Sequence, residues 1–557
     1  MDRFTLELEP QTDSTEPSFA ELHPQFVQLA SEVATLRREN LELRQRAGYY
    51  QNLHARALER NAKLQLENNE LLGRIRQLQD CQFGTSTEKQ SKSDRSNSLE
   101  GFDENEPDPD VPKKPRVAPK RRNFDHLPTK PEVVELPVEQ QTCPHCGQPR
   151  QEMSDTEDSE QLEIEVRAYR RVIHRKRYRQ TCDCPGCQTI ATPVPPKLIP
   201  KSRLATSVWV EILLAKYFSH QPIERLLSGW KLMGLDLSAS TVNTGLERLE
   251  PLFVPIYEAL RDRNRLSAYQ QADETRWLVF VEKEGKTGYR WWLWVFLGED
   301  TVVFVLDSSR SHEVPEAHFT SGTPQILMVD RYSAYQAMRP VKEDLILLAF
   351  CWAHVRRDFI RVAKGFPELK RWAIEWLELI REAYRCNRKR VKQMGTPEFA
   401  ATDAELRKIM NSMQTQAAEQ LSDEKLRAPC RKALVSLQNH WVGLTRFVDD
   451  PRIPMDNNAS ERAARGPAVG RKNYYGSGSE WSGQLGMMLF SIFATLTKWK
   501  INPRTWLRWY LDECANAGGR TPLDVGRFLP WNSSEEQRKK LGEAIPFGPM
   551  EDVLNSS

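Results

Sequence analysis

At 557 residues the chain is too long for one ordinary hydrophobic core, and three or four domains are expected. Charged residues make up 28% of it and hydrophobic residues 39%, while the net charge of +3 hides a segregation of opposite charges along the chain. No apolar run reaches the roughly eighteen residues that a membrane span requires, and MDRFTLELEP lacks the order of a signal peptide. Ten cysteines then indicate thiols or metal ligands rather than disulfides, so a membrane or secreted protein is excluded and a cytoplasmic location is expected.

Residues 22–82 are predicted to form one long helix with a heptad repeat. Leucine occupies six of the eight d positions of this repeat: Leu29, Leu36, Leu43, Leu64, Leu71 and Leu78. Asparagine at three a positions (Asn40, Asn61 and Asn68) lowers the stability of a coiled coil but pairs well across a parallel dimer. The segment is therefore interpreted as a homodimerisation helix, and a long helix folded back on its own domain is the alternative.

Two segments of different composition follow this helix. Residues 83–130 contain too little apolar surface to offset the entropy of ordering, so they are predicted to be a disordered linker. Residues 131–200 hold two short-spaced cysteine groups, CPHCG and CDCPGC, which favour a zinc ribbon. The best tetrahedral ligand set is Cys143, Cys146, Cys184 and Cys187, with Cys182 as a substitute. A thioredoxin-like redox pair is the rival interpretation of CPHC, but it needs a βαβ context that the surrounding sequence lacks.

A basic strip lies between the two cysteine groups. Residues 167–179 carry seven Arg and Lys and no acid, and a strip of this kind favours a polyanionic partner. The residues expected to contact DNA phosphates here are Arg170, Arg171, Arg175 and Arg177.

Residues 201–265 return to a helical pattern, in which Gly234 ends one helix and Ser238 or Ser240 caps the next. A helix, a short glycine-containing turn and a second helix make up the layout of a helix-turn-helix DNA reader. A helical hairpin packed on its neighbour fits the same pattern equally well. A helical DNA-binding domain is therefore one of two open interpretations.

Residues 266–500 are predicted to form an α/β domain. Its first part contains five runs rich in Val, Phe and Trp that are typical of successive strands, and residues 361–450 are helical. The apolar run 485–496 is interpreted as a buried helix, and residues 501–557 as a C-terminal helical region.

Three acids occupy places in this α/β domain that suit metal chemistry. Asp273 lies in the first predicted strand, Asp330 directly follows a buried one, and Glu461 opens a helix for which Asn457 and Asn458 are candidate caps. Carboxylate oxygens suit Mg²⁺ or Mn²⁺, and three of them can hold two ions for phosphoryl chemistry. The cations expected to hold the phosphodiester backbone nearby are Arg462, Arg465, Arg471 and Lys472.

Several strings around these acids resemble the transposases of the bacterial insertion sequence 66 family. They are ADET (272–275), DRYSAY (330–335), CWAHVRRDF (351–359) and MDNNASERAARGPAVGRKNYYGSGS (455–479). The upstream segments are similar in the same order: a leucine-rich helix, FGTSTEK (83–89), CPHCG and KYFSHQPIERLL (216–227). The resemblance therefore covers nearly the whole chain, and its last block is the most specific.

This resemblance implies a ribonuclease H-like core of the DDE type, in which Asp273, Asp330 and Glu461 are the catalytic acids and the helical stretch 361–450 looks like an insertion. Cys351 and His354 form a C-x-x-H element similar to one beside the second Asp of several DDE transposases, and a structural hydrogen bond is the favoured role for His354. Arg276 and Arg331 depart from the family pattern, which has proline and glycine at these places. An arginine beside each metal acid is expected either to bind DNA or to alter the metal site.

The leading hypothesis is a bacterial, nucleoid-associated transposase. It would bind the terminal inverted repeats of its element as a dimer, cleave to expose 3′-OH ends and join them to target DNA, and the resemblance also implies accessory proteins. A catalytically silent DNA-binding regulator is the alternative, and a structure-specific nuclease is a third possibility. Three converging acids favour an enzyme, and the long binding arms favour a transposase. Substitutions of the neighbouring acids Glu274 and Asp456 are expected to have milder effects than those of the three catalytic acids.

Overall fold

The computed structural model describes residues 19–83, 137, 145–149, 162, 168–178, 190–282, 288–319 and 326–542. The chain divides into two compact units, one made of residues 1–101 and 360–375 and the other of residues 102–359 and 376–557. The predicted linker and most of the predicted zinc-binding segment lie outside the described residues.

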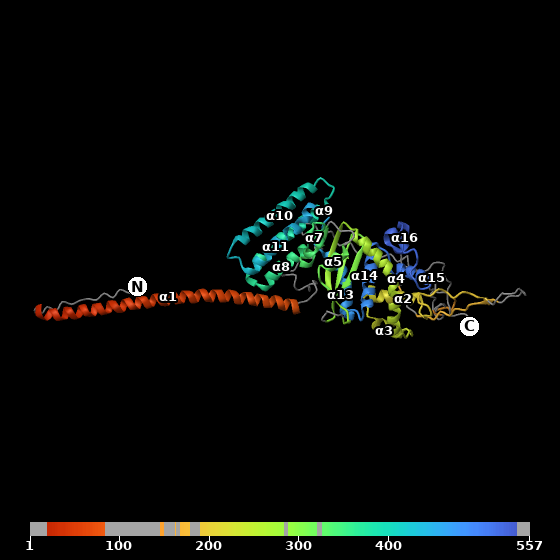
Figure 1. Ribbon diagram of the computed structural model, residues 1–557, viewed down its shortest axis with the longest axis horizontal. Helices are drawn as coiled ribbons and strands as arrows, with labels where there is room; N and C mark the ends of the chain where they lie inside the picture. Colours follow the sequence, from red (N-terminus) through yellow and green to blue (C-terminus); the bar gives the residue numbers. More distant parts are fainter. Residues whose placement is uncertain are drawn as a thin grey trace. The chain divides into compact units, whose positions relative to one another are not determined.

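The first unit is dominated by α1 (Phe19–Phe83), an uninterrupted helix that confirms the helix predicted for residues 22–82 (Figure 1). The leucines of its heptad that the structure describes, Leu29, Leu36, Leu43, Leu64 and Leu71, are all exposed. Near its end, Gly73 lies against the ring of Phe366, and Arg76 donates a hydrogen bond to the carbonyl of Gly365 (3.3 Å).

The second unit is built on a five-stranded mixed sheet, as the five predicted strands required. The strands are β3 (Tyr269–Leu278), β4 (Arg290–Leu297), β5 (Val302–Asp307), β6 (Ile326–Val329) and β7 (Leu347–Phe350). Their order is β5-β4-β3-β6-β7. The first three strands form an antiparallel meander, while β6 and β7 run parallel to β3. β3 is central, and its residues 269–271 pair with β6 while its residues 271–278 pair with β4.

Helices from both ends of this unit share one apolar core with the sheet (Figure 1). The N-terminal ones are α2 (Thr206–Leu213), the π-helical turn η3 (Leu214–Phe218), α3 (Ile223–Leu232) and α4 (Ala239–Arg265). The C-terminal ones are α13 (Asn458–Tyr474), α14 (Glu480–Lys498), α15 (Pro503–Asn516) and α16 (Glu535–Gly542). Ser238 caps α4 by accepting a hydrogen bond from the backbone of Thr241, which decides between the two predicted caps.

Helix α14 is the buried helix that the apolar run 485–496 predicted. Its hydroxyls also cover the edge strand β5, because Ser491 Oγ accepts a hydrogen bond from the backbone of Phe304 (2.8 Å) and Thr495 Oγ1 accepts one from that of Val302 (3.0 Å). This contact blocks an edge that would otherwise be open to further strand pairing. Among the described helices, none is long and apolar enough to cross a membrane.

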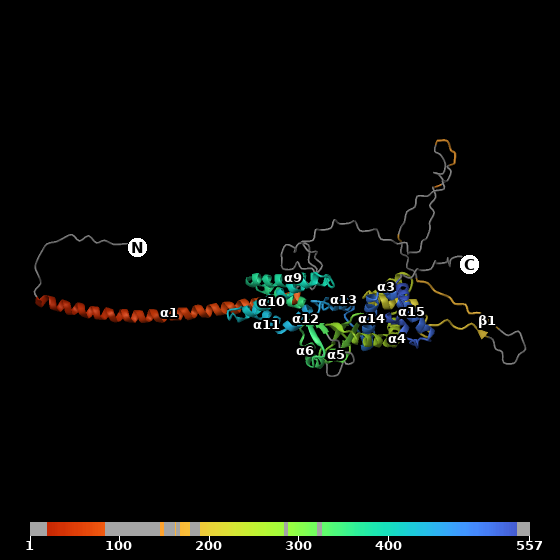
Figure 2. The same cartoon turned by 90° about the horizontal axis from the view of Figure 1, so that it is seen from above.

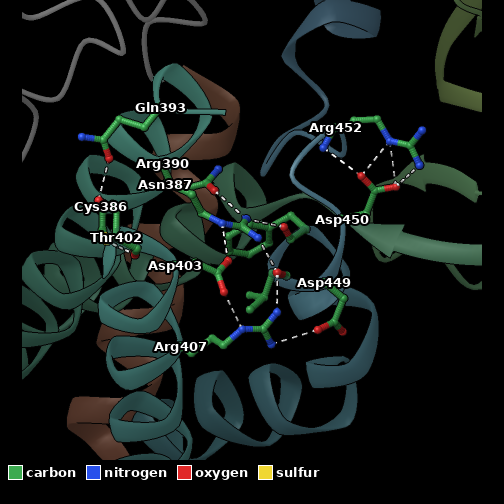
Figure 3. Close-up of polar contacts among 12 residues, drawn as sticks. Cys386, Asn387, Arg390, Gln393, Thr402, Asp403, Arg407, Asp449, Asp450 and Arg452 are labelled. Atoms are coloured by element: carbon green, nitrogen blue, oxygen red, sulfur yellow. Dashed lines mark hydrogen bonds and ion pairs between the residues drawn. The ribbon is translucent and has the colours of Figure 1, made fainter. Parts of the chain in front are cut away.

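The predicted insertion is helical throughout. It contains α9 (Lys370–Lys392), α10 (Phe399–Ser422), α11 (Ala428–Asn439) and α12 (Trp441–Asp449), preceded by α8 (Trp352–Gly365) and the short turn η4 (Pro367–Leu369). Figure 2 shows α9 to α12 as neighbouring helices. The buried guanidinium of Arg390 joins three of them, because it forms an ion pair with Asp403 (2.6 Å) and donates to the carbonyls of Phe447 and Val448 (Figure 3).

The remaining elements are short. Helices α5 (Glu313–His318), α6 (Ser333–Ala337) and α7 (Arg339–Lys342) connect the strands of the sheet. The turns η5 (Gly526–Phe528) and η6 (Pro530–Asn532) precede α16. Strands β1 (Arg177–Tyr178) and β2 (Ile190–Ala191) pair antiparallel within the segment that was predicted to bind zinc.

Candidate active site

Asp273 and Asp330 lie on adjacent strands of the sheet. Asp273 is in the middle of the central strand β3, and Asp330 is the first residue after β6. Strands β3 and β6 are parallel with Gln271 opposite Met328, so the same register, continued by two residues, sets Asp273 opposite Asp330. The sequence therefore predicted the positions of both acids correctly.

Glu461 reaches the same part of the sheet in the first turn of α13. The helix is tied to β3 at its start: the side-chain amide of Asn457 donates to the carbonyl of Ala272 (2.7 Å), and the backbone N–H of Ser460 donates to Gln271 Oε1 (3.2 Å). The expectation that Asn457 or Asn458 caps this helix with its side chain is wrong for Asn457. Its amide is fully buried and is directed at the strand, where it fixes α13 beside Asp273.

The electrostatics of Asp273 show how these acids affect one another. The pKa of Asp273 is raised to about 8. Burial is the largest cause, and the negative charges of Glu274, Glu461 and Asp330 act in the same direction. A carboxylate that is buried next to other carboxylates strongly favours a bound proton or a bound cation. The donor set therefore fits a divalent metal ion in its chemistry, since hard oxygen ligands with excess negative charge are what Mg²⁺ binds.

Glu461 is held by a cation in the described structure. Arg357 of α8 donates to Glu461 Oε2 (3.1 Å), and His354 Nε2 lies 3.0 Å from Arg357 Nη1. Burial and the charge of Arg357 lower the pKa of His354 to about 4, so this ring is neutral at physiological pH. Within the described ranges, no three acidic, histidine or cysteine side chains are already arranged as a metal-binding group.

Cys351, the first residue of the C-x-x-H element, lies in the core. It is fully buried, and its Sγ accepts a hydrogen bond from the backbone N–H of Asn457 (3.2 Å). Burial raises the pKa of this thiol to about 12. Cys351 therefore links the end of β7 to the start of α13 as a neutral thiol.

Glu274 was expected to matter less than the three catalytic acids, and the structure shows that it is deeply embedded. Its side chain is 2% exposed and forms an ion pair with Arg310 (2.6 Å). The hydroxyl of Tyr335 donates to its other oxygen (2.7 Å). The sequence offered no local signal for this group, because its members are separated by 36 and 61 residues.

The two arginines that depart from the family pattern have different surroundings. Arg331 forms an ion pair with Asp358 (2.5 Å) and donates a hydrogen bond to Ser436 (2.7 Å). Arg276 is exposed on β3. Arg471, expected to hold DNA, instead donates to Thr275 Oγ1 (3.1 Å) and to the carbonyl of Arg276. Three other predicted DNA contacts on α13 are exposed: Arg462, Arg465 and Lys472.

The predicted zinc ligands fall almost entirely outside the described residues. Those outside are Cys143, Cys182, Cys184 and Cys187. Cys146 is described as an exposed free thiol. The four arginines predicted to contact phosphates in the basic strip, Arg170, Arg171, Arg175 and Arg177, are exposed.

Comparison with known proteins gives the class of protein to which this fold and these acids belong. The family model described as "Transposase IS66 family" matches residues 201–485, which is just over half of the chain. The chain therefore belongs to the IS66 transposase family, as its motifs predicted.

Three relatives come from Sinorhizobium fredii (strain NBRC 101917 / NGR234). The uncharacterized protein y4jD is 26% identical over 74% of this chain and 81% of its own length. The uncharacterized protein y4hP is 24% identical over 72% of this chain and 74% of its own length. The uncharacterized protein y4qI is 25% identical over 75% of this chain and 78% of its own length. The similarity thus extends well beyond the matched family region.

Proposed function

We propose that this protein is a DDE-type DNA transposase that cleaves the ends of its element and joins them to target DNA. The observation that carries the proposal is the state of Asp273, a buried carboxyl whose pKa is raised to about 8 by burial and by the acids around it, including Glu461 and Asp330. These three acids come from two strands and a helix far apart in the sequence. A protein that bound DNA without cutting it would have no physical need to bring them together.

Asp273, Asp330 and Glu461 would hold two Mg²⁺ or Mn²⁺ ions. Bound ions of this kind activate the attacking water or 3′-OH and stabilise the leaving oxygen of a phosphodiester. In this arrangement the backbone ties from Asn457 and Ser460 hold Glu461 beside β3. Arg357 competes with the metal for Glu461, so metal binding would require Glu461 to exchange this guanidinium for the ion.

A ribonuclease H-like core accounts for the sheet. An antiparallel meander of three strands extended by two parallel ones, with the acids on the central strand and its parallel neighbour, supports this proposal. The helices α9 to α12 would then be an insertion between the last core strand and the helix that carries Glu461.

The N-terminal segments would bind DNA and pair two copies of the chain. The exposed leucines of α1 support a parallel coiled-coil dimer, and sedimentation of a fragment of residues 20–82 as a monomer at tens of micromolar would exclude it. The cysteine groups would bind one Zn²⁺, and the exposed arginines of the basic strip would contact the terminal inverted repeats. Elemental analysis of protein purified without chelator should find that zinc.

The decisive experiment incubates the purified chain with DNA carrying its element ends and Mg²⁺, and scores cleavage and strand transfer. Asp273→Asn, Asp330→Asn and Glu461→Gln keep the shape of each side chain but remove charge that a divalent cation needs. Each should abolish both reactions and leave end binding close to that of the unchanged protein. Strand transfer by Glu461→Gln would disprove the assignment of the third acid.

A catalytically silent DNA-binding regulator is the second candidate. The ion pair between Arg357 and Glu461 favours it, because a guanidinium already compensates one of the three acids. The same experiment separates the two functions. If the unchanged protein binds the ends but cuts nothing with Mg²⁺ or Mn²⁺, the regulator is the better account.

A further inference from the structure

Two arginines flank Asp330, and they differ in what they can reach. Arg331 follows Asp330 in the chain, but its side chain is 13% exposed and is held by Asp358 and Ser436. Arg310 comes from the loop after β5, and the charge of Asp330 acts on its guanidinium. Its side chain is 38% exposed. Arg310 is therefore the one of this pair that is accessible to a ligand beside the acids.

The guanidinium of Arg310 is held in place from three sides. Its Nη2 lies 2.6 Å from Glu274 Oε1, and its Cζ lies 3.9 Å from the centre of the Tyr332 ring and 4.5 Å from that of Trp292. The Tyr332 hydroxyl also donates to the carbonyl of Arg310 (3.0 Å), which fixes the backbone of the loop. A guanidinium held in this way loses little conformational freedom when it binds a further anion.

Further cations lie on the same face of the sheet as Arg310. Arg276 of β3 lies directly opposite Trp292 of β4. Arg290 lies on the same face of β4, two residues before Trp292 and opposite Leu278. Both arginines are therefore close to the Trp292 ring, on which Arg310 stacks. Arg276 and Arg290 are exposed. Of the acids nearby, Glu274 is paired with Arg310, while Asp307 lies opposite Trp292 and keeps its charge, accepting a hydrogen bond from the backbone N–H of Ser309 (2.7 Å). A half-buried aromatic ring among three guanidinium groups complements a phosphodiester backbone.

We propose that Arg310, Arg276 and Arg290 form a DNA-binding surface that leads a phosphodiester strand to Asp330. Arg310 contacts the phosphate nearest Asp330, and the Trp292 ring forms the floor of the surface. Glu274 is the positioning residue, since it holds Arg310 against both rings. The inference rests on the proposed function for the identity of the acids, and its own content is where the DNA strand runs.

The test is DNA binding by the full-length protein in buffer without Mg²⁺ or Mn²⁺, so that no strand is cut and zinc is retained. The probes are a fluorescein-labelled duplex carrying the element end and a random-sequence duplex of the same length, titrated at several salt concentrations. The main variant is the double substitution Glu274→Gln with Arg310→Gln, which removes both partners of the ion pair and leaves no unpaired buried charge. The matched control is Asp358→Asn with Arg331→Gln, the pair on the other side of Asp330.

The main variant should bind both duplexes several-fold more weakly, because a phosphate contact carries no sequence information. The slope of log affinity against log salt should fall in magnitude by about 0.9 for the one lost contact. The control should bind as the unchanged protein does. Equal affinity and equal slope in the main variant and the control would overturn the proposal. Arg310 would then have only a structural role, in fixing the loop after β5.

A second variant guards against misfolding of the first. Arg276→Gln with Arg290→Gln alters two exposed side chains and should lower the salt slope by about 1.8 for two contacts. An unchanged slope in this variant would likewise overturn the proposal. Failure of the proposed function is a separate result: there the unchanged protein cuts no DNA, whatever the salt slopes show.

Discussion

Buried charges have different surroundings in the helical insertion and at the acid cluster of the sheet. In the insertion, Arg390 is 1% exposed, and Asp403 and the carbonyls of Phe447 and Val448 compensate it (Figure 3). Burial raises the pKa of Asp403, but hydrogen bonds and charge from Arg407 and Arg390 outweigh this effect and lower it overall. At the sheet, the pKa of Asp273 is raised to about 8 because burial and three neighbouring acids act in the same direction.

This difference separates a structural charge cluster from a functional one. The network around Arg390 supplies each buried group with an opposite charge or a carbonyl, so it holds α9, α10 and α12 together. The acids at the sheet lack that compensation around Asp273, and a site that stores unfavourable charge is where a cation or a proton will bind. The following predictions test the contrast through protein stability.

The largest stability effect is expected from Asp403→Asn. The change leaves Arg390 buried without its counter-charge, and loss of one partner of a buried pair should lower the free energy of unfolding by about 2–4 kcal/mol. Urea unfolding followed by tryptophan fluorescence measures it. Asp449→Asn is the matched control, because Asp449 contacts Arg407 from an exposed position and should change stability by less than about 0.5 kcal/mol. Equal effects of the two variants would show that the Arg390 network is not structural.

Asp273→Asn should change the free energy of unfolding in the opposite direction. In EDTA it is expected to raise the free energy of unfolding by about 1–3 kcal/mol at pH 7 to 8, because it removes an acid that is ionised in the unfolded chain but resists ionisation when folded. The folded pKa is above the unfolded one, so the native protein loses stability as pH rises from about 4 through about 8. The advantage of the variant should therefore vanish near pH 4. If the variant were less stable than the unchanged protein at pH 8, the claim that ionised Asp273 destabilises the folded protein would be contradicted.

Glu274→Gln sharpens the comparison because this acid lies between Asp403, whose charge is compensated by arginines, and Asp273, whose charge is not. Burial raises its pKa, while hydrogen bonds from Arg310 and Tyr335 oppose the rise. Its loss should lower stability by about 1–2 kcal/mol, less than for Asp403, because the partner Arg310 is partly exposed and water can solvate it. Asp456→Asn should be milder. A Glu274→Gln variant as stable as the unchanged protein would restore the expectation that substituting this acid has a mild effect.

The sequence predicted the elements of the sheet better than the partners of its side chains. The strands and the helices of the insertion follow from local periodicity, and Asp273, Asp330 and Glu461 were singled out because the sequence around them resembles the family. The pairing of Arg331 with Asp358 and Ser436 was missed, as was that of Asn457 with Ala272. These contacts join residues 27 to 185 positions apart, so tertiary packing decides them and local pattern carries no trace of them.

The smallest predicted effect concerns His318, a neutral buried base in the same unit. Its ring stacks on Phe296 at 3.9 Å and lies 2.8 Å from Asn264 Oδ1, and burial with the charges of Arg265 and Arg261 lowers its pKa well below 6.5. His318 is therefore protonated in the unfolded chain at a pH where it stays neutral in the folded chain, and the folded protein loses stability as pH falls below about 6.5.

His318→Gln should remove this contribution. The variant will be less stable at pH 8 because it lacks the ring stack, but its deficit should shrink by about 0.8 kcal/mol between pH 8 and pH 6, the amount set by a group that titrates at about 6.5 in the unfolded chain alone. Urea unfolding at the two pH values measures the change. A deficit that stays constant would mean that the folded protein protonates His318 as readily as the unfolded chain. Burial beside two arginines would then not be what sets its charge.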